Sequence, residues 1–166
     1  MKKFLLALLV AGILVFPGYV FAAVGTCTQT MDEVASSTSP IGFMRSITFV
    51  CTASADNGSF PSTATSTANT ALIRGLRLRA VVVYNGSTAP TPLYSIAING
   101  ALGVDTLGGA GYSITGVAST GVQLVPWGAM SKRPVERPVD GALTLVITGN
   151  VVNSALVTVK AYFTND

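Results

Sequence analysis

Alternating apolar and polar side chains are the main pattern along this chain, and they predict β-strands. In residues 45–53, one face of a strand would carry Ile47, Phe49 and Cys51, and the other Thr48, Val50 and Thr52. Alternation of period two is typical of a strand that packs on one face. Residues 71–84 are expected to form the longest strand, with one apolar face made of Leu76, Leu78, Ala80, Val82 and Tyr84. Arg77 and Arg79 then lie on the other face, which Val81 and Val83 continue.

Five further segments are predicted as strands: 94–99, 112–117, 122–125, 143–148 and 155–163. In the last of them, period two directs one set of side chains inward, namely Ala155, Val157, Val159, Ala161 and Phe163. The outward set is Leu156, Thr158, Lys160 and Tyr162. The Gly149-Asn150 and Asn153-Ser154 pairs suggest that the last two strands form a hairpin.

Turn-forming residues separate these segments. Residues 59–70 consist mostly of Ser, Thr, Ala and Asn and are expected to be a surface loop, residues 100–111 are glycine-rich, and residues 126–141 hold three prolines in a long loop or edge. The fold predicted from about seven strands is an all-β antiparallel sandwich or jelly roll. The predicted strands do not alternate with predicted helices, so the pattern argues against a doubly wound fold.

The N-terminus carries the pattern of a secretory signal peptide. Lys2 and Lys3 precede an apolar run, Pro17-Gly18 interrupts it, and small residues follow. Cleavage is expected after Ala22, with Ala23 nearly as suitable. The alternative is an uncleaved anchor, because residues 4–23 are long and apolar enough to span a bilayer.

This pattern divides the chain into a signal peptide (1–22), an N-terminal arm (23–43) with few apolar residues, and one sandwich domain (44–166). The net charge of +3 includes Lys2 and Lys3, so the mature chain carries +1. A charge this small does not favour binding to nucleic acid, and a membrane contact is expected only through an uncleaved signal.

Cys27 and Cys51 are the only cysteines, and both lie in the part expected to be exported. An oxidising compartment favours a disulfide between them, which would tie the arm to the sandwich. Two free buried thiols are the alternative. Without histidine, two cysteines cannot complete a zinc site, and no metal or other cofactor is expected.

The absence of histidine also removes the usual general base of Ser-His-Asp and Cys-His catalysis, so the chain is not expected to be an enzyme. A carboxylate pair that hydrolyses glycosides is a distant alternative. Asp105, in the sequence Asp-Thr-Leu-Gly-Gly, is similar to a fragment of a calcium loop, but a glycine-rich turn capped by the aspartate explains it better.

Four residues are candidates for a protein interface. Arg77 and Arg79, with Arg74 nearby, could bind carboxylates of a neighbouring subunit, or they could form a solvated strand face or protect a sheet edge. Trp127, the only tryptophan, could anchor a loop in a partner's pocket or fill the core. Tyr162 would join the interface if the outward face of the last strand is an assembly surface.

Several motifs follow one another in a recognisable order. Pro90-Thr91-Pro92-Leu93-Tyr94-Ser95-Ile96 precedes Gly103-Val104-Asp105-Thr106-Leu107-Gly108-Gly109, followed by Gly141-Ala142-Leu143-Thr144-Leu145 and Val152-Asn153-Ser154-Ala155. Over about residues 44–166, this order resembles small all-β structural proteins of tailed phages and prophages, although Ser95 stands where an Asp is usual. The resemblance implies a virion subunit. Because such virions assemble in the cytoplasm, either the chain starts at Met31 or Met44, or it is an exported relative of a virion module.

The hypothesis favoured by the sequence is a non-enzymatic structural subunit of virion type, whose partners are copies of itself or other structural proteins. The main alternative is a secreted or surface-bound binding or adhesion module, and a histidine-free enzyme is a more distant one. An exported location is expected: periplasmic, extracellular or on the cell surface. A virion is expected instead if the start site or the export signal is misleading.

Overall fold

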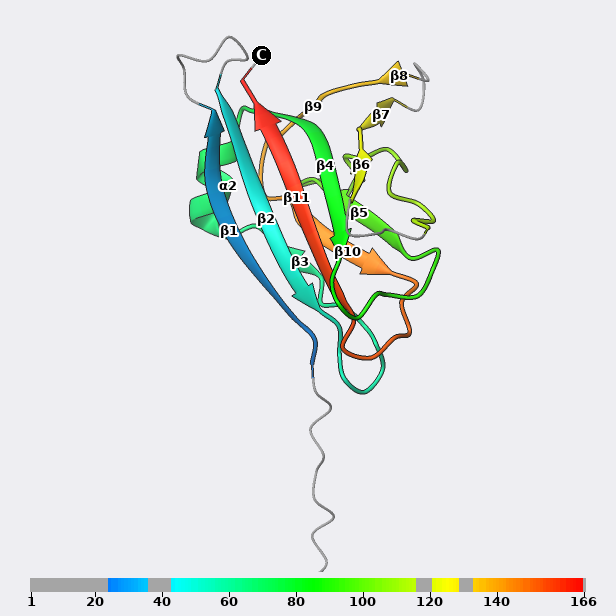
Figure 1. The fold of residues 1–166 in the computed structure, drawn as a ribbon. Helices are drawn as coiled ribbons and strands as arrows, with labels where there is room; N and C mark the ends of the chain where they lie inside the picture. Colours follow the sequence, from blue (N-terminus) through cyan, green and yellow to red (C-terminus); the bar gives the residue numbers. More distant parts are fainter. Residues whose placement is uncertain (1–23, 36–42, 116–120, 129–132, 166) are drawn as a thin grey trace, which may run out of the picture.

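The computed structural model describes residues 24–35, 43–115, 121–128 and 133–165. In these residues the chain forms an all-β fold of antiparallel strands with one short helix. Two sheets pack face to face, and Figure 1 shows the larger one in front of the smaller one. The prediction of an all-β antiparallel sandwich is therefore confirmed.

The larger sheet has the strand order β1-β2-β11-β4-β6, and β9 also pairs with β4. Its long strands are β1 (Thr26–Ala35), β2 (Met44–Thr52), β4 (Arg77–Asn85) and β11 (Leu156–Thr164). Two short strands complete it, β6 (Val122–Leu124) and β9 (Arg137–Pro138). The central strands β2 and β11 pair without interruption over nine residues each.

The smaller sheet has the order β3-β10-β5 and consists of β3 (Thr63–Ala64), β10 (Thr144–Thr148) and β5 (Ser95–Asn99). A two-stranded ribbon, β7 (Trp127–Gly128) with β8 (Arg133–Pro134), lies outside both sheets. One core joins the layers, because Phe49 and Val159 of the larger sheet belong to the same buried cluster as Ile98 and Leu145 of the smaller. The inward residues predicted for β11 are all buried, among them Phe163, which is fully enclosed.

The connection between the last two strands differs from the prediction. β10 pairs with β5 and β3, whereas β11 pairs with β2 and β4, so the two consecutive strands belong to different sheets and form no hairpin. The chain crosses from one layer to the other between residues 149 and 155. Turn residues between two strands are compatible with both a hairpin and a crossover between sheets, and only packing against the rest of the chain distinguishes the two connections.

Strand β4 changes faces within its length. Tyr162 lies opposite Ala80 but Phe163 lies opposite Leu78, so Arg79 is an extra residue in a bulge. Beyond the bulge, Val81 and Val83 are fully buried, while Val82 and Tyr84 lie on the other face. The predicted single face from Leu76 to Tyr84 is therefore wrong, because one inserted residue reverses the alternation.

Three other segments depart from the prediction. The expected arm contains β1, paired with β2 from Thr26 opposite Thr52 onward, because a partner strand supplies backbone hydrogen bonds even to a polar segment. The expected surface loop and the start of the expected long strand contain β3 and helix α2 (Thr67–Ile73), whose first turn is capped by the Ser66 hydroxyl accepting from the Asn69 amide. The described residues of 112–117 contribute only a single bridge, between Ile114 and Tyr94.

Candidate functional site

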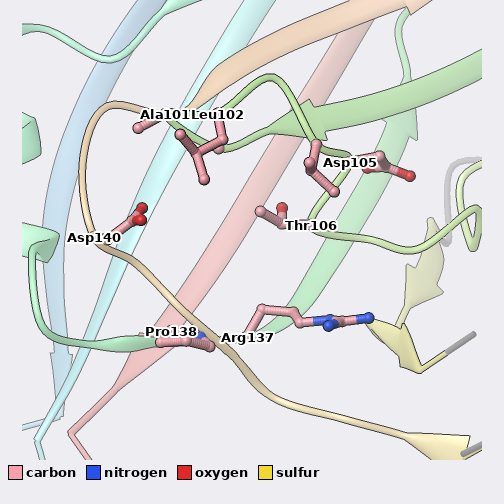
Figure 2. Close-up of a pocket in the computed structure, with 9 residues that line it drawn as sticks. Ala101, Leu102, Asp105, Thr106, Arg137, Pro138 and Asp140 are labelled. Carbon is pink, nitrogen blue, oxygen red and sulfur yellow. The ribbon is translucent and has the colours of Figure 1, made fainter. Parts of the chain in front are cut away.

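The candidate site drawn in Figure 2 is an open hollow of about 230 Å³ between two loops. One wall is the turn after β5, with Ala101, Leu102 and Thr106, and the other is the segment that contains Arg137 and Asp140. The side chains of Asp140 and Arg137 come from opposite ends of that second wall (Figure 2). Besides Asp105, the hollow therefore offers one guanidinium and one carboxylate, which lie apart from each other (Figure 2).

Most other polar groups of the hollow hold its own wall in shape. Asp105 accepts hydrogen bonds from the amides of Ile98 (3.2 Å), Leu107 (3.0 Å) and Gly109 (2.8 Å). The Thr106 hydroxyl donates to the Ile98 carbonyl at 2.6 Å. Asp105 thus caps a glycine-rich turn, as the sequence indicated, and its oxygens are engaged by the backbone. Among the described residues, no group of three or more His, Cys, Asp or Glu side chains is placed to hold a metal ion.

Arg137 connects the hollow to the β7–β8 ribbon. Its Nη2 donates to the Trp127 carbonyl at 2.9 Å, and its Nε is buried without a hydrogen-bond partner among the described residues. The Trp127 amide in turn donates to the Leu107 carbonyl at 3.0 Å. The backbone of Trp127 is therefore fixed from both sides. Its side chain is 41% exposed, which favours a surface role over that of a core residue.

The basic cluster predicted from the sequence does not act as a unit at a sheet edge. Arg77 and Arg79 belong to β4, which has neighbours on both sides, so they do not protect an edge. The Nε of Arg79 lies 4.0 Å from Glu136 Oε1, an ion pair at the limit of contact distance. Arg74 is separate from them, at the end of α2.

Tyr162 lies on the outer face of the larger sheet, next to Lys160 on the same strand. The Lys160 ammonium is 5.4 Å from the centre of the Tyr162 ring, within the range of a cation–π contact. The same face carries Val50, which is 47% exposed, and Thr158. The faces predicted for β11 are confirmed, and Tyr162 points away from the core.

The predicted disulfide is present. Cys27 and Cys51 are bonded to each other and lie directly opposite in the β1–β2 pair. The bond joins the strand at the edge of the sheet to its neighbour, and it is consistent with an oxidising, exported environment. A start at Met31 would remove Cys27 and half of β1, and a start at Met44 would remove the whole strand.

Two residues organise the molecule without a signal that singled them out in the sequence. The Asn150 side chain accepts from the Thr91 amide (2.8 Å) and donates to the carbonyls of Gly58 (2.6 Å) and Val152 (2.9 Å), and so joins three loops. The buried Tyr94 hydroxyl donates to Asn85 Oδ1 at 2.8 Å, and burial raises the pKa of Tyr94 to about 12. In the sequence, the Gly149-Asn150 pair predicts only a turn, and the structure is needed to show which groups the Asn150 side chain contacts.

The expected signal peptide, with its cleavage positions at Ala22 and Ala23, lies outside the described residues. Within those residues, no helix has the length and apolar character needed to cross a membrane.

Comparison with known proteins finds no matching family model and no significant match among curated proteins or solved structures. The class that the fold defines is an all-β sandwich with a disulfide, and a functional proposal has to rest on its surfaces.

Proposed function

We propose that this protein is a non-enzymatic structural subunit that assembles with copies of itself or with other structural proteins. The observation that carries the proposal is the outer face of the larger sheet, which no described element covers (Figure 1). Antiparallel sheets commonly have one solvated face, so its composition has to decide whether it is a contact surface.

That composition is unusual for a solvated face. From the row of Thr52 to the row of Ser46, β2, β11 and the paired part of β4 direct outward mainly Thr, Val, Leu and Tyr side chains. Lys160 carries the only charge among them. A protein interface has few charged residues at its centre and is enriched in aromatic residues, which matches Tyr84 and Tyr162 on this face. At one end of this face, Ser46 and Thr164 are fully buried, so their side chains do not belong to its exposed surface.

Two further observations support the proposal: the first bears on an exported setting and the second on a structural role. The disulfide is of a kind that persists in oxidising compartments. The resemblance of the motifs to structural proteins of tailed phages points to the same class of role, and virion membership stays a prediction.

The test is self-association of the mature protein, measured by analytical ultracentrifugation over a range of concentrations. Wild type is expected to form oligomers, and Tyr162→Ala is expected to remove the contacts made through this face and so reduce the size of the oligomers, while the subunit stays folded. Tyr112→Ala is the matched control, because it removes the same ring from a loop where the side chain is 78% exposed. Equal effects of the two variants, or a wild type that stays monomeric and binds no structural partner, would contradict the proposal.

A secreted binding or adhesion module is the second candidate, and one observation favours it. The turn beside the hollow exposes Leu102 (86%) and Val104 (68%), two apolar side chains at the tip of a loop. Binding modules commonly present such residues on loops. In this case the protein would bind a surface as a monomer, Leu102→Asp would abolish the binding, and Tyr162→Ala would not.

A further inference from the structure

Strand β1 forms one edge of the larger sheet. Strand β1 is ten residues long, and among the described residues β2 is its only neighbour. An unpaired edge of this length is a template for another strand. The opposite side of the sheet ends in β6 and β9, which have three and two residues.

The hydrogen-bond pattern of the sheet shows which backbone groups of β1 point outward. The Ala53 amide donates to the Ala155 carbonyl, so odd-numbered residues of β2 direct their backbone groups towards β11. The even-numbered ones therefore bond to even-numbered residues of β1. The Cα atoms of Cys27 and Cys51 are 4.0 Å apart, a short spacing that agrees with a pair not hydrogen-bonded to each other. The amides and carbonyls of Cys27, Gln29, Met31 and Glu33 consequently face the open edge.

The side chains at this edge leave it accessible. Gln29 turns its amide inward, where Oε1 accepts from the Ser66 amide at 3.0 Å and Nε2 donates to the Ala64 carbonyl at 3.0 Å. The outward-facing threonines Thr26, Thr28 and Thr30 are exposed and uncharged. The two carboxylates, Asp32 and Glu33, lie near one end of the strand, which has no basic residue.

We propose that two copies of the chain pair antiparallel through β1, with Gln29 of each copy opposite Gln29 of the other on a twofold axis. In this register Thr28 faces Thr30 twice, and Thr26 faces Asp32 twice. Odd-numbered residues then pair with odd-numbered ones, as the outward-facing backbone groups require.

Charge and composition select a second copy as the occupant, in this orientation. Antiparallel pairing places the carboxylates of the two copies at opposite ends of the contact, whereas parallel in-register pairing would stack them on each other. Thr–Thr pairs across strands are favourable, and this strand supplies both members of each pair. A twofold axis perpendicular to the sheet also joins the outer faces of the two copies into one continuous surface. The inference uses an edge and not that face, so it stands or fails separately from the proposed function.

The first test is a charge exchange at two exposed positions, read as the dimer dissociation constant in analytical ultracentrifugation. Thr28→Lys with Thr30→Lys places lysines opposite each other twice and is expected to raise the constant at least about tenfold. Thr28→Lys with Thr30→Glu is the matched control, because opposite charges then face each other twice and dimerisation is expected to persist. Equal constants for the two double variants, or a monomeric wild type, would overturn the inference.

The second test removes one outward amide. Met31→Pro deletes an N–H that the β1–β2 pair does not use, and proline is tolerated on edge strands for this reason. It is expected to weaken the dimer at least about tenfold, whereas Met31→Ala, which also shortens the side chain but keeps the amide, leaves it nearly intact. Should the proline variant fail to fold, the charge exchange still decides. If Tyr162→Ala dissociates the assembly and no β1 variant does, this inference is wrong and the proposed function stands; the reverse result supports the edge and contradicts the face.

Discussion

Strands β2 and β11 pair over nine consecutive residues, whereas β10 pairs with β5 over five residues and with β3 over two. The larger sheet is ordered by long backbone ladders over a regular apolar face. Around the smaller sheet, the chain is ordered by side chains that bond to distant backbone groups. Asn150 donates to the Gly58 carbonyl, and the Thr65 hydroxyl accepts from the Leu143 amide at 3.1 Å. Regular alternation of apolar and polar residues is enough to order the larger sheet. The smaller sheet depends in addition on a few polar side chains, each of which forms hydrogen bonds with specific backbone groups.

The largest expected effect is the loss of a core side chain from the larger sheet. Phe163 is fully buried, so Phe163→Ala should reduce the free energy of unfolding by about 3–5 kcal/mol. Tyr162→Ala, one residue earlier on the same strand and on the outer face, should cost less than about 1 kcal/mol in the monomer. Urea unfolding of the mature protein measures both. A larger cost for Tyr162→Ala would mean that the faces of β11 are reversed.

Removing the disulfide tests how far the edge strand of the larger sheet depends on a covalent bond. The sequence separation is 24 residues, for which the loop-closure model gives a stabilisation of about 3 kcal/mol. Changing both Cys27 and Cys51 to alanine should lower stability by about that amount, again in urea unfolding. Reductant added to wild type is the control, and mass spectrometry should find free thiols only after reduction.

Asn150→Ala tests the polar side chains that order the loops between the layers. It removes hydrogen bonds to three loop segments and should cost about 2–3 kcal/mol. Asn153→Ala changes an exposed asparagine in the same connection and should cost little. Hydrogen exchange should speed up near Gly58 and Thr91 in the first variant only; unchanged exchange there would show that the loops hold themselves in place.

Tyr94→Phe is expected to have the smallest effect at neutral pH, about 1 kcal/mol, because it removes a single hydrogen bond to Asn85. Its effect changes with pH. Burial raises the pKa of Tyr94 from 10.0 to about 12, so the neutral phenol is favoured in the folded state. The associated stability is fully present below pH 10 and is lost as the pH rises towards 12. Wild type should therefore lose more stability than Tyr94→Phe over this interval; parallel pH profiles would contradict it.

The alternation in β2, β5 and β11 predicts which residues are buried, because the period of two follows from the geometry of an extended chain. Tyr94, Ile96 and Ile98 are buried as their spacing indicates, and so are Val157, Val159 and Phe163. The same reasoning failed in β4, where Arg79 is inserted into a bulge that depends on the partner strand. It also missed β1, which lies at an edge and has few apolar residues to reveal it.

By itself, the sequence determined that the fold is all-β, which side chains of the regular strands face inward and, with only two cysteines, which residues a disulfide could join. These features are local, or they follow from the composition. Only the tertiary structure decided that β10 and β11 belong to different layers, that β1 is the last strand at one side of the larger sheet in the described part of the chain, and that Asn150 holds three loops together. Each of these depends on contacts between residues far apart in the chain, such as Asn150 with Gly58, and nothing in the local sequence of either partner indicates the other.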